Sequence, residues 1–76
     1  MEAQMVALWT RVLARPVGPD DDLFADLAAD SLEVLELLEC IGDEFGVIVS
    51  VEDLFQAPTA VGAAGLVQAR GVPTPS

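Results

Sequence analysis

The chain has 76 residues, enough for one small domain, and 53% of them are hydrophobic, which excludes a disordered tail. Thirteen acidic residues face three arginines, so the net charge is -10, and the chain has no histidine. The charge argues against nucleic acids and anionic membranes as partners, and the missing histidine excludes the usual Ser-His and Cys-His nucleophile pairs. We therefore do not expect an autonomous enzyme.

No part of the sequence indicates export or membrane insertion. Met1 is followed by Glu2 rather than by basic residues, and the longest uncharged stretch, residues 54–69, contains a proline and two glycines. Cys40 is the single cysteine, so it cannot form an internal disulfide. We expect a monomeric, cytoplasmic protein.

Apolar residues recur at helical spacing over residues 3–14, which predicts an amphipathic helix with Trp9 in the core. Two prolines and a glycine in RPVGPDDD end this helix, and a loop continues to residue 29. Leu23, Phe24 and Leu27 are expected to anchor the loop in the core. The acids of this loop lack the alternation and the glycine of an EF-hand, so we expect no metal site.

A second helix is predicted to begin at Asp30 or Ser31 and to run to Phe45. At about 100° per residue its apolar side carries Val34, Leu35, Leu37, Leu38, Ile41 and Phe45. The opposite side carries Glu33, Glu36, Glu39, Asp43 and Glu44, with Leu32 exposed among them. Cys40 falls on this acidic side, where the carboxylates disfavour a reactive thiolate, so we expect it to be structural or incidental. The concentrated acids predict attraction to basic protein surfaces.

The rest of the chain predicts a connector and two further helices. Val47 to Val49 should be a buried connector, because the chain offers no partner strand. Ser50 and Asp53 have capping-box spacing for a short helix over residues 51–57, and Thr59 can cap a last helix to about residue 69. The sum is an all-α, small four-helix bundle of three main helices and one short helix. It forms a single domain over residues 1–70, followed by a flexible C-terminal tail over residues 71–76.

Ser31 has two possible roles at the start of the acidic helix. Spacing alone favours the first, in which Ser31 is the N-cap and nothing more. In the second, Asp30 and Glu33 form a capping box, and the Ser31 hydroxyl lies on the first turn, where backbone N–H groups favour an attached anion. Leu32, exposed beside Ser31 and flanked by acids, favours the second role, because it has the character of a docking contact.

Two segments carry a family resemblance. DLAADSLEVLELL, residues 26–38, closely resembles the modification motif of acyl carrier proteins, typically D-L-G-x-D-S-L. VEDLFQAPTA, residues 51–60, resembles the third-helix region of carrier domains, including peptidyl carriers. The resemblance implies a four-helix carrier fold in which Ser31 receives covalent 4′-phosphopantetheine from coenzyme A through a separate phosphopantetheinyl transferase. It also implies that the chain catalyses nothing and presents acyl or aminoacyl thioesters to partner enzymes.

The partners implied by the resemblance are the transferase and the enzymes that load and transfer the cargo. We expect their basic docking surfaces to contact Leu32, Glu33, Glu36 and Glu39. Ala28 stands where the family usually has glycine, which predicts a differently shaped turn before the serine.

Several details of the sequence bear on the pathway. A position often apolar in fatty-acid carriers holds Glu39, which argues against a housekeeping fatty-acid role. Asp30 favours acyl carriers, whereas LFQAPT favours peptidyl carriers. We therefore favour a stand-alone carrier of a specialised polyketide, nonribosomal peptide or hybrid pathway. The alternative from another class is a small acidic helical interaction domain without a prosthetic group.

Overall fold

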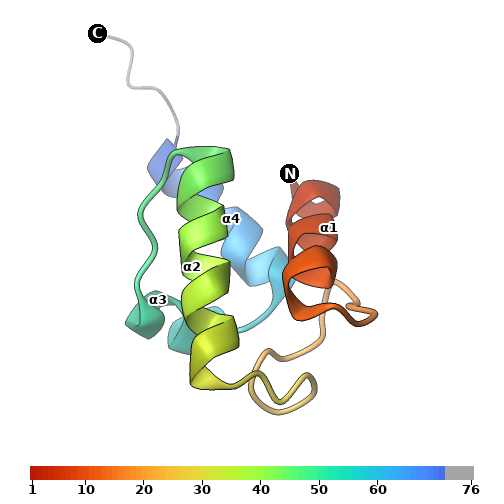
Figure 1. The fold of residues 1–76 in the computed structure, drawn as a ribbon. Coiled ribbons are helices and arrows are strands. Elements are labelled where there is room, and N and C mark those ends of the chain that lie inside the picture. Colours follow the sequence, from red (N-terminus) through yellow and green to blue (C-terminus); the bar gives the residue numbers. More distant parts are fainter. Residues whose placement is uncertain (72–76) are drawn as a thin grey trace, which may run out of the picture.

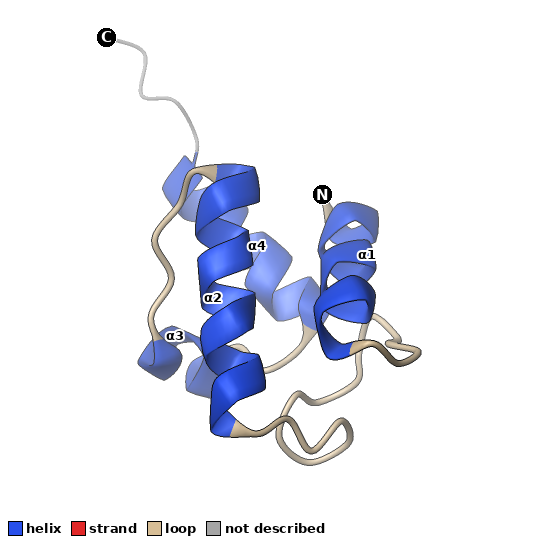
Figure 2. Ribbon diagram, viewed as in Figure 1, coloured by secondary structure: helices blue, strands red, loops and turns tan. Residues whose placement is uncertain are grey.

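Four helices form the fold of residues 1–71, the part of the chain that this computed structural model describes. They are α1 (Glu2–Leu13), α2 (Ser31–Phe45), α3 (Val51–Gln56) and α4 (Ala60–Gly71). Within the described residues there is no strand, and no helix is long and apolar enough to cross a membrane (Figure 2). The predicted all-α bundle is confirmed. Residues 72–76, most of the predicted tail, lie outside the described residues, and Gly71 belongs to α4.

Short-range capping sets the helix boundaries. The backbone N–H of Gly46, whose φ is 67°, donates to Gly42 O at 2.9 Å and ends α2. Ser50 caps α3 in the predicted capping box with Asp53. Thr59 Oγ1 accepts a hydrogen bond from Gly62 N at 2.9 Å at the start of α4, as predicted.

The core lies between the three long helices, and every helix contributes to it (Figure 1). α4 packs chiefly against α1, and α3 contacts α2. Trp9 is fully buried, as predicted. The other core side chains of the helices are Met5, Leu8, Leu13, Val34, Leu37, Ile41, Leu54, Ala60, Ala63, Ala64 and Val67.

The loop between α1 and α2 is tied to the junction of α3 and α4. Leu23 N donates to Pro58 O at 2.7 Å, and Leu23 and Leu27 are buried, which confirms them as anchors. Phe24 is only half-buried and stacks on Phe55 at the edge of the core, with ring centroids 4.7 Å apart. The loop thereby delivers the chain to the first turn of α2.

Three expected environments differ in the structure. Leu35 was assigned to the apolar side of α2 but is 56% exposed, because it lies more than a quarter turn from the stripe centred on Leu37 at about 100° per residue. Cys40 is partly buried against the core rather than fully on the acidic side, because it lies at the boundary of that stripe. The connector buries Val47 and Val49, but Ile48 is 89% exposed between them.

Candidate functional site

The N-terminus of α2 is closed by Asp30 and Glu33. Asp30 Oδ1 accepts a hydrogen bond from Glu33 N at 2.8 Å, and Glu33 Oε1 accepts one from Asp30 N at 3.2 Å. Both capping-box bonds are therefore present, and the cap is Asp30. The alternative in which Ser31 is the cap is wrong. Ser31 is instead the first residue of α2 and is exposed.

An anion joined to Ser31 would lie at the positive end of a 15-residue helix. The first backbone N–H groups of an α-helix lack partners within the helix, and the capping box satisfies only part of them. Helix N-termini of this kind bind phosphate and sulfate. The exposed hydroxyl of Ser31 is thus well placed to bear a phosphate ester.

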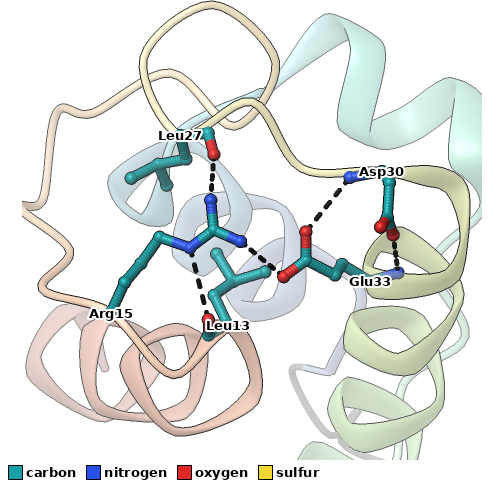
Figure 3. A network of polar contacts seen from close by, with 5 residues as sticks. All are labelled: Leu13, Arg15, Leu27, Asp30 and Glu33. Carbon is teal, nitrogen blue, oxygen red and sulfur yellow. Dashed lines mark hydrogen bonds and ion pairs between the residues drawn. The ribbon is translucent and has the colours of Figure 1, made fainter.

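Sequence reasoning missed the role of Arg15 at this site. Figure 3 shows its guanidinium between the end of α1, the loop and the start of α2. Arg15 Nη2 donates to Glu33 Oε2 at 2.5 Å, Nε donates to Leu13 O at 3.2 Å, and Nη1 donates to Leu27 O. The only signal in the sequence was that Arg15 is the last basic residue before Arg70.

The four predicted partner-binding residues fall into two groups. Leu32 is 65% exposed, and Glu36 and Glu39 are also exposed. Their spacing of four and then three residues places them on one side of α2. Glu33 differs, because its side chain is only 23% exposed and both of its oxygens accept hydrogen bonds from this chain. The structure therefore groups three of the four on one exposed surface.

A groove of about 380 Å³ opens beside Ser31. Its size lies within the range of small-molecule pockets, and most of its walls are apolar. The stacked rings of Phe24 and Phe55 form part of the wall. Its lining residues are Phe24, Ala29, Asp30, Ser31, Val34, Leu35, Val51 and Phe55. The sequence offered no sign of it, because Leu35 falls on the predicted apolar side of the second helix, where burial is expected.

An ion pair between Asp53 and Arg70 links α3, which forms one wall of the groove, to α4. Arg70 Nη1 and Nη2 donate to the two oxygens of Asp53 at 2.5 and 2.8 Å, and Nη1 also donates to Ile48 O at 3.2 Å. The side-chain hydrogen bond from Arg70, and next the backbone N–H of Ser50, hold the pKa of the Asp53 carboxyl well below its usual range. Asp53 is thus ionised at neutral pH and holds α3 in place.

Comparisons with known proteins agree on one family. The family model described as "Phosphopantetheine attachment site" matches residues 3–67. Pyochelin synthetase PchE of Pseudomonas aeruginosa is 37% identical over 71 residues, which cover 93% of this chain and 5% of that protein. Surfactin synthase subunit 1 of Bacillus subtilis is 37% identical over 67 residues, which cover 87% of this chain and 2% of that protein. The chain therefore spans only a small fraction of the length of these relatives.

Among solved structures, BlmI is similar over most of its length. BlmI is a type-II acyl carrier protein from Streptomyces verticillus involved in bleomycin biosynthesis. The TM-score is 0.79 at 28% identity, and the match covers 90% of this chain and 82% of BlmI.

Proposed function

This chain belongs to the phosphopantetheine attachment site family, and from that membership we propose that Ser31 is the residue that carries the group. The chain is a carrier domain homologous to those of nonribosomal peptide and polyketide synthetases, and its family binds 4′-phosphopantetheine. The predicted family and cofactor are confirmed. The observation that carries the assignment of Ser31 is that Asp30 caps α2 and leaves the neighbouring hydroxyl exposed.

The surroundings of Ser31 fit the group in two respects. The N-terminus of α2 favours the negative charge of a phosphodiester. The groove beside Ser31 offers apolar surface from Val34, Leu35 and Phe55 along which an attached chain can lie. When bound, the group supplies a terminal thiol that holds acyl or aminoacyl groups as thioesters.

Attachment requires Ser31 Oγ to form a new P–O bond while the pyrophosphate P–O bond of coenzyme A breaks and adenosine 3′,5′-bisphosphate leaves. The Ser31 proton must pass to a base in the same step. The chain has no histidine, and the Asp30 carboxylate is used by the cap. We therefore assign the base to a separate phosphopantetheinyl transferase, and we propose that this chain presents its cargo and catalyses nothing.

The surface formed by Leu32, Glu36 and Glu39 supports docking of the transferase and of the enzymes that load and transfer the cargo. These side chains are exposed on α2, from one to eight residues after Ser31, and the chain's net charge of -10 favours partners with basic surfaces. Glu33 was predicted to share this role. Its bonds to Arg15 and Asp30 support a structural role in the cap instead.

The pathway that fits the relatives is a specialised one. Two further relatives are a hybrid PKS-NRPS synthetase, TAS1 of Botryobasidium botryosum, and a nonribosomal peptide synthetase, ecdA of Aspergillus rugulosus, and BlmI is a type-II carrier involved in bleomycin biosynthesis. We propose that residues 1–70 form a stand-alone cytoplasmic carrier domain of a nonribosomal peptide, polyketide or hybrid pathway. An interaction domain without a prosthetic group finds no support in the family match.

Intact-mass measurement after incubation with coenzyme A and a broad-specificity transferase tests the assignment. The wild type should gain one phosphopantetheine group. Ser31→Ala should gain none while keeping its helical circular dichroism. Ser50→Ala is the matched control, because Ser50 is also an exposed serine at a helix N-terminus, and it should gain the group normally. A modified Ser31→Ala chain would contradict the proposal.

A further inference from the structure

We propose that Arg15 is a positioning residue that holds the turn bearing Ser31 in the geometry needed for modification. The inference rests on the proposed attachment of the group at Ser31. Arg15 is distant from Ser31 in the sequence and lies outside the surface formed by Leu32, Glu36 and Glu39, but it contributes to the rate of attachment.

Arg15 joins three separate parts of the chain with one side chain. Its acceptors are Leu13 O at the end of α1, Leu27 O in the loop, and Glu33 Oε2 in the first turn of α2 (Figure 3). The planar guanidinium presents its donors in a fixed fork, which suits three acceptors lying in different directions. A lysine ammonium carries one charged nitrogen on a flexible stem and cannot reproduce this arrangement.

Two of the three acceptors bracket the segment that contains Ser31. Leu27 precedes the serine by four residues and Glu33 follows it by two. Glu33 in turn restrains Asp30, because its other oxygen accepts the hydrogen bond from Asp30 N. Arg15 therefore restrains the chain on both sides of the hydroxyl that must reach the transferase.

The bracketed segment contains a backbone conformation that needs such restraint. Ala28 has a φ of 49°, in the left-handed region that L-residues other than glycine rarely adopt. Strained conformations persist only where the surroundings over-determine them. The bond from Arg15 to Leu27 O fixes the carbonyl directly before Ala28. On the other side of Ala28, Ala29 N donates to Leu23 O at 3.0 Å, so the bond from Arg15 is one of two restraints on this turn. We expect its loss to let Ala28 rotate more often to a negative φ and to turn Asp30 and Ser31 away from their present direction.

Arg11 provides a matched comparison. It lies on α1, whereas Arg15 follows the end of that helix, and it also pairs with an acid of α2, Glu44, but at the opposite end of α2 from Ser31. That pair is more open, with side chains 60% and 41% exposed against 36% and 23% for Arg15 and Glu33. Replacing either arginine by lysine keeps the net charge, so long-range attraction to a basic transferase stays the same in both variants.

The test measures loading kinetics of the full chain with coenzyme A and a broad-specificity transferase. Arg15→Lys should lower kcat by roughly tenfold, because the bound chain spends most of its time with Ser31 misdirected. KM for the chain should stay within about twofold, because Leu32, Glu36 and Glu39 are untouched. Arg11→Lys should behave as the wild type. Arg15→Lys loading at the wild-type rate, or an equal loss in Arg11→Lys, would overturn the proposal.

Rescue by glycine separates positioning from a general loss of stability. Because glycine adopts the left-handed conformation without strain, Ala28→Gly should restore about threefold or more of the rate lost in Arg15→Lys. The same change in the wild type should alter the rate by less than about twofold. Rescue in the double variant supports the proposal, and its absence overturns it.

Amide hydrogen exchange of the unmodified chain supplies a readout independent of loading. Measured well below the melting temperature, Arg15→Lys should exchange faster over residues 27–33 while the core of α4 keeps its protection. Faster exchange spread equally over all four helices would overturn the proposal. A wild-type chain that accepts no group would refute attachment at Ser31. A wild type and an Arg15→Lys variant that load equally well would refute only the role of Arg15.

Discussion

Replacing Ala28 by glycine is expected to stabilise the unmodified chain. Ala28 is exposed and has a φ of 49°, so the change removes strain without removing a buried contact. The left-handed conformation costs an L-residue about 1–2 kcal/mol. The greater freedom of glycine in the unfolded chain offsets about 0.4–1 kcal/mol of that gain. The net gain should be about 0.8 kcal/mol.

Thermal melts followed by circular dichroism measure this effect. In a domain of this size about 1 kcal/mol shifts Tm by about 4–8 °C, so Ala28→Gly should melt about 3–6 °C above the wild type. Ala14→Gly should also raise Tm, because Ala14 is exposed and ends α1 with a φ of 54°.

Ala25→Gly is the control with the opposite sign. Ala25 is exposed in the same loop but does not have a positive φ, so glycine there should lower stability by about 0.4–1 kcal/mol. If Ala28→Gly lowers Tm as Ala25→Gly does, the backbone at Ala28 stores no strain. The reasoning about the turn before Ser31 would then be refuted.

Three further predictions concern the rest of the molecule. Cys40→Ser should load and transfer cargo as the wild type does, because Cys40 is partly buried and lies nine residues, about two and a half turns of α2, from Ser31; a large loss in a folded variant would contradict this. Glu36→Lys should melt no lower than the wild type, because each like-charge pair that it removes costs about 0.2–0.5 kcal/mol. It should nevertheless be loaded more slowly than the wild type at low salt, and this difference in rate should shrink as the salt concentration rises. Loading at the wild-type rate at low salt would show that Glu36 is not a docking contact. Asp53→Asn should be less stable than the wild type at neutral pH. This difference in stability should close as the pH falls below 3.8, the usual carboxyl pKa, because the pKa of Asp53 in the folded chain is lower still and the stabilisation by the ionised carboxylate is lost on protonation. A difference that stays constant into strong acid would contradict the role of the pair with Arg70.

Local features of the sequence were sufficient to predict the helices. The caps of α2, α3 and α4 depend on residues three positions apart, and Asp30, Ser50 and Thr59 all form the predicted bonds. Hydrophobic periodicity placed Trp9 and Leu37 correctly in the core. The caps and the hydrophobic periodicity depend on residues that are close together in the sequence, so the sequence alone is sufficient to predict them.

Features that depend on distant segments were not predictable in this way. The angle of Leu35 on α2 could be calculated, but nothing in the sequence shows that Leu35 lines a groove together with Phe24 of the loop and Phe55 of α3. The pairing of Arg15 with Glu33 joins residues 18 positions apart and depends on the path of the loop. From the sequence alone Glu33 is therefore as available for docking as Glu36, whereas in the structure its carboxylate is bonded within the chain.

Tandem mass spectrometry of the modified wild-type chain identifies the residue that carries the group. After incubation with coenzyme A and the transferase, the chain is digested and the modified peptide is fragmented. We predict that the added mass lies on Ser31 alone and that Ser50, Thr59 and Cys40 are unmodified. The added mass on any of those residues, or on none in a chain incubated with active transferase, would contradict this prediction.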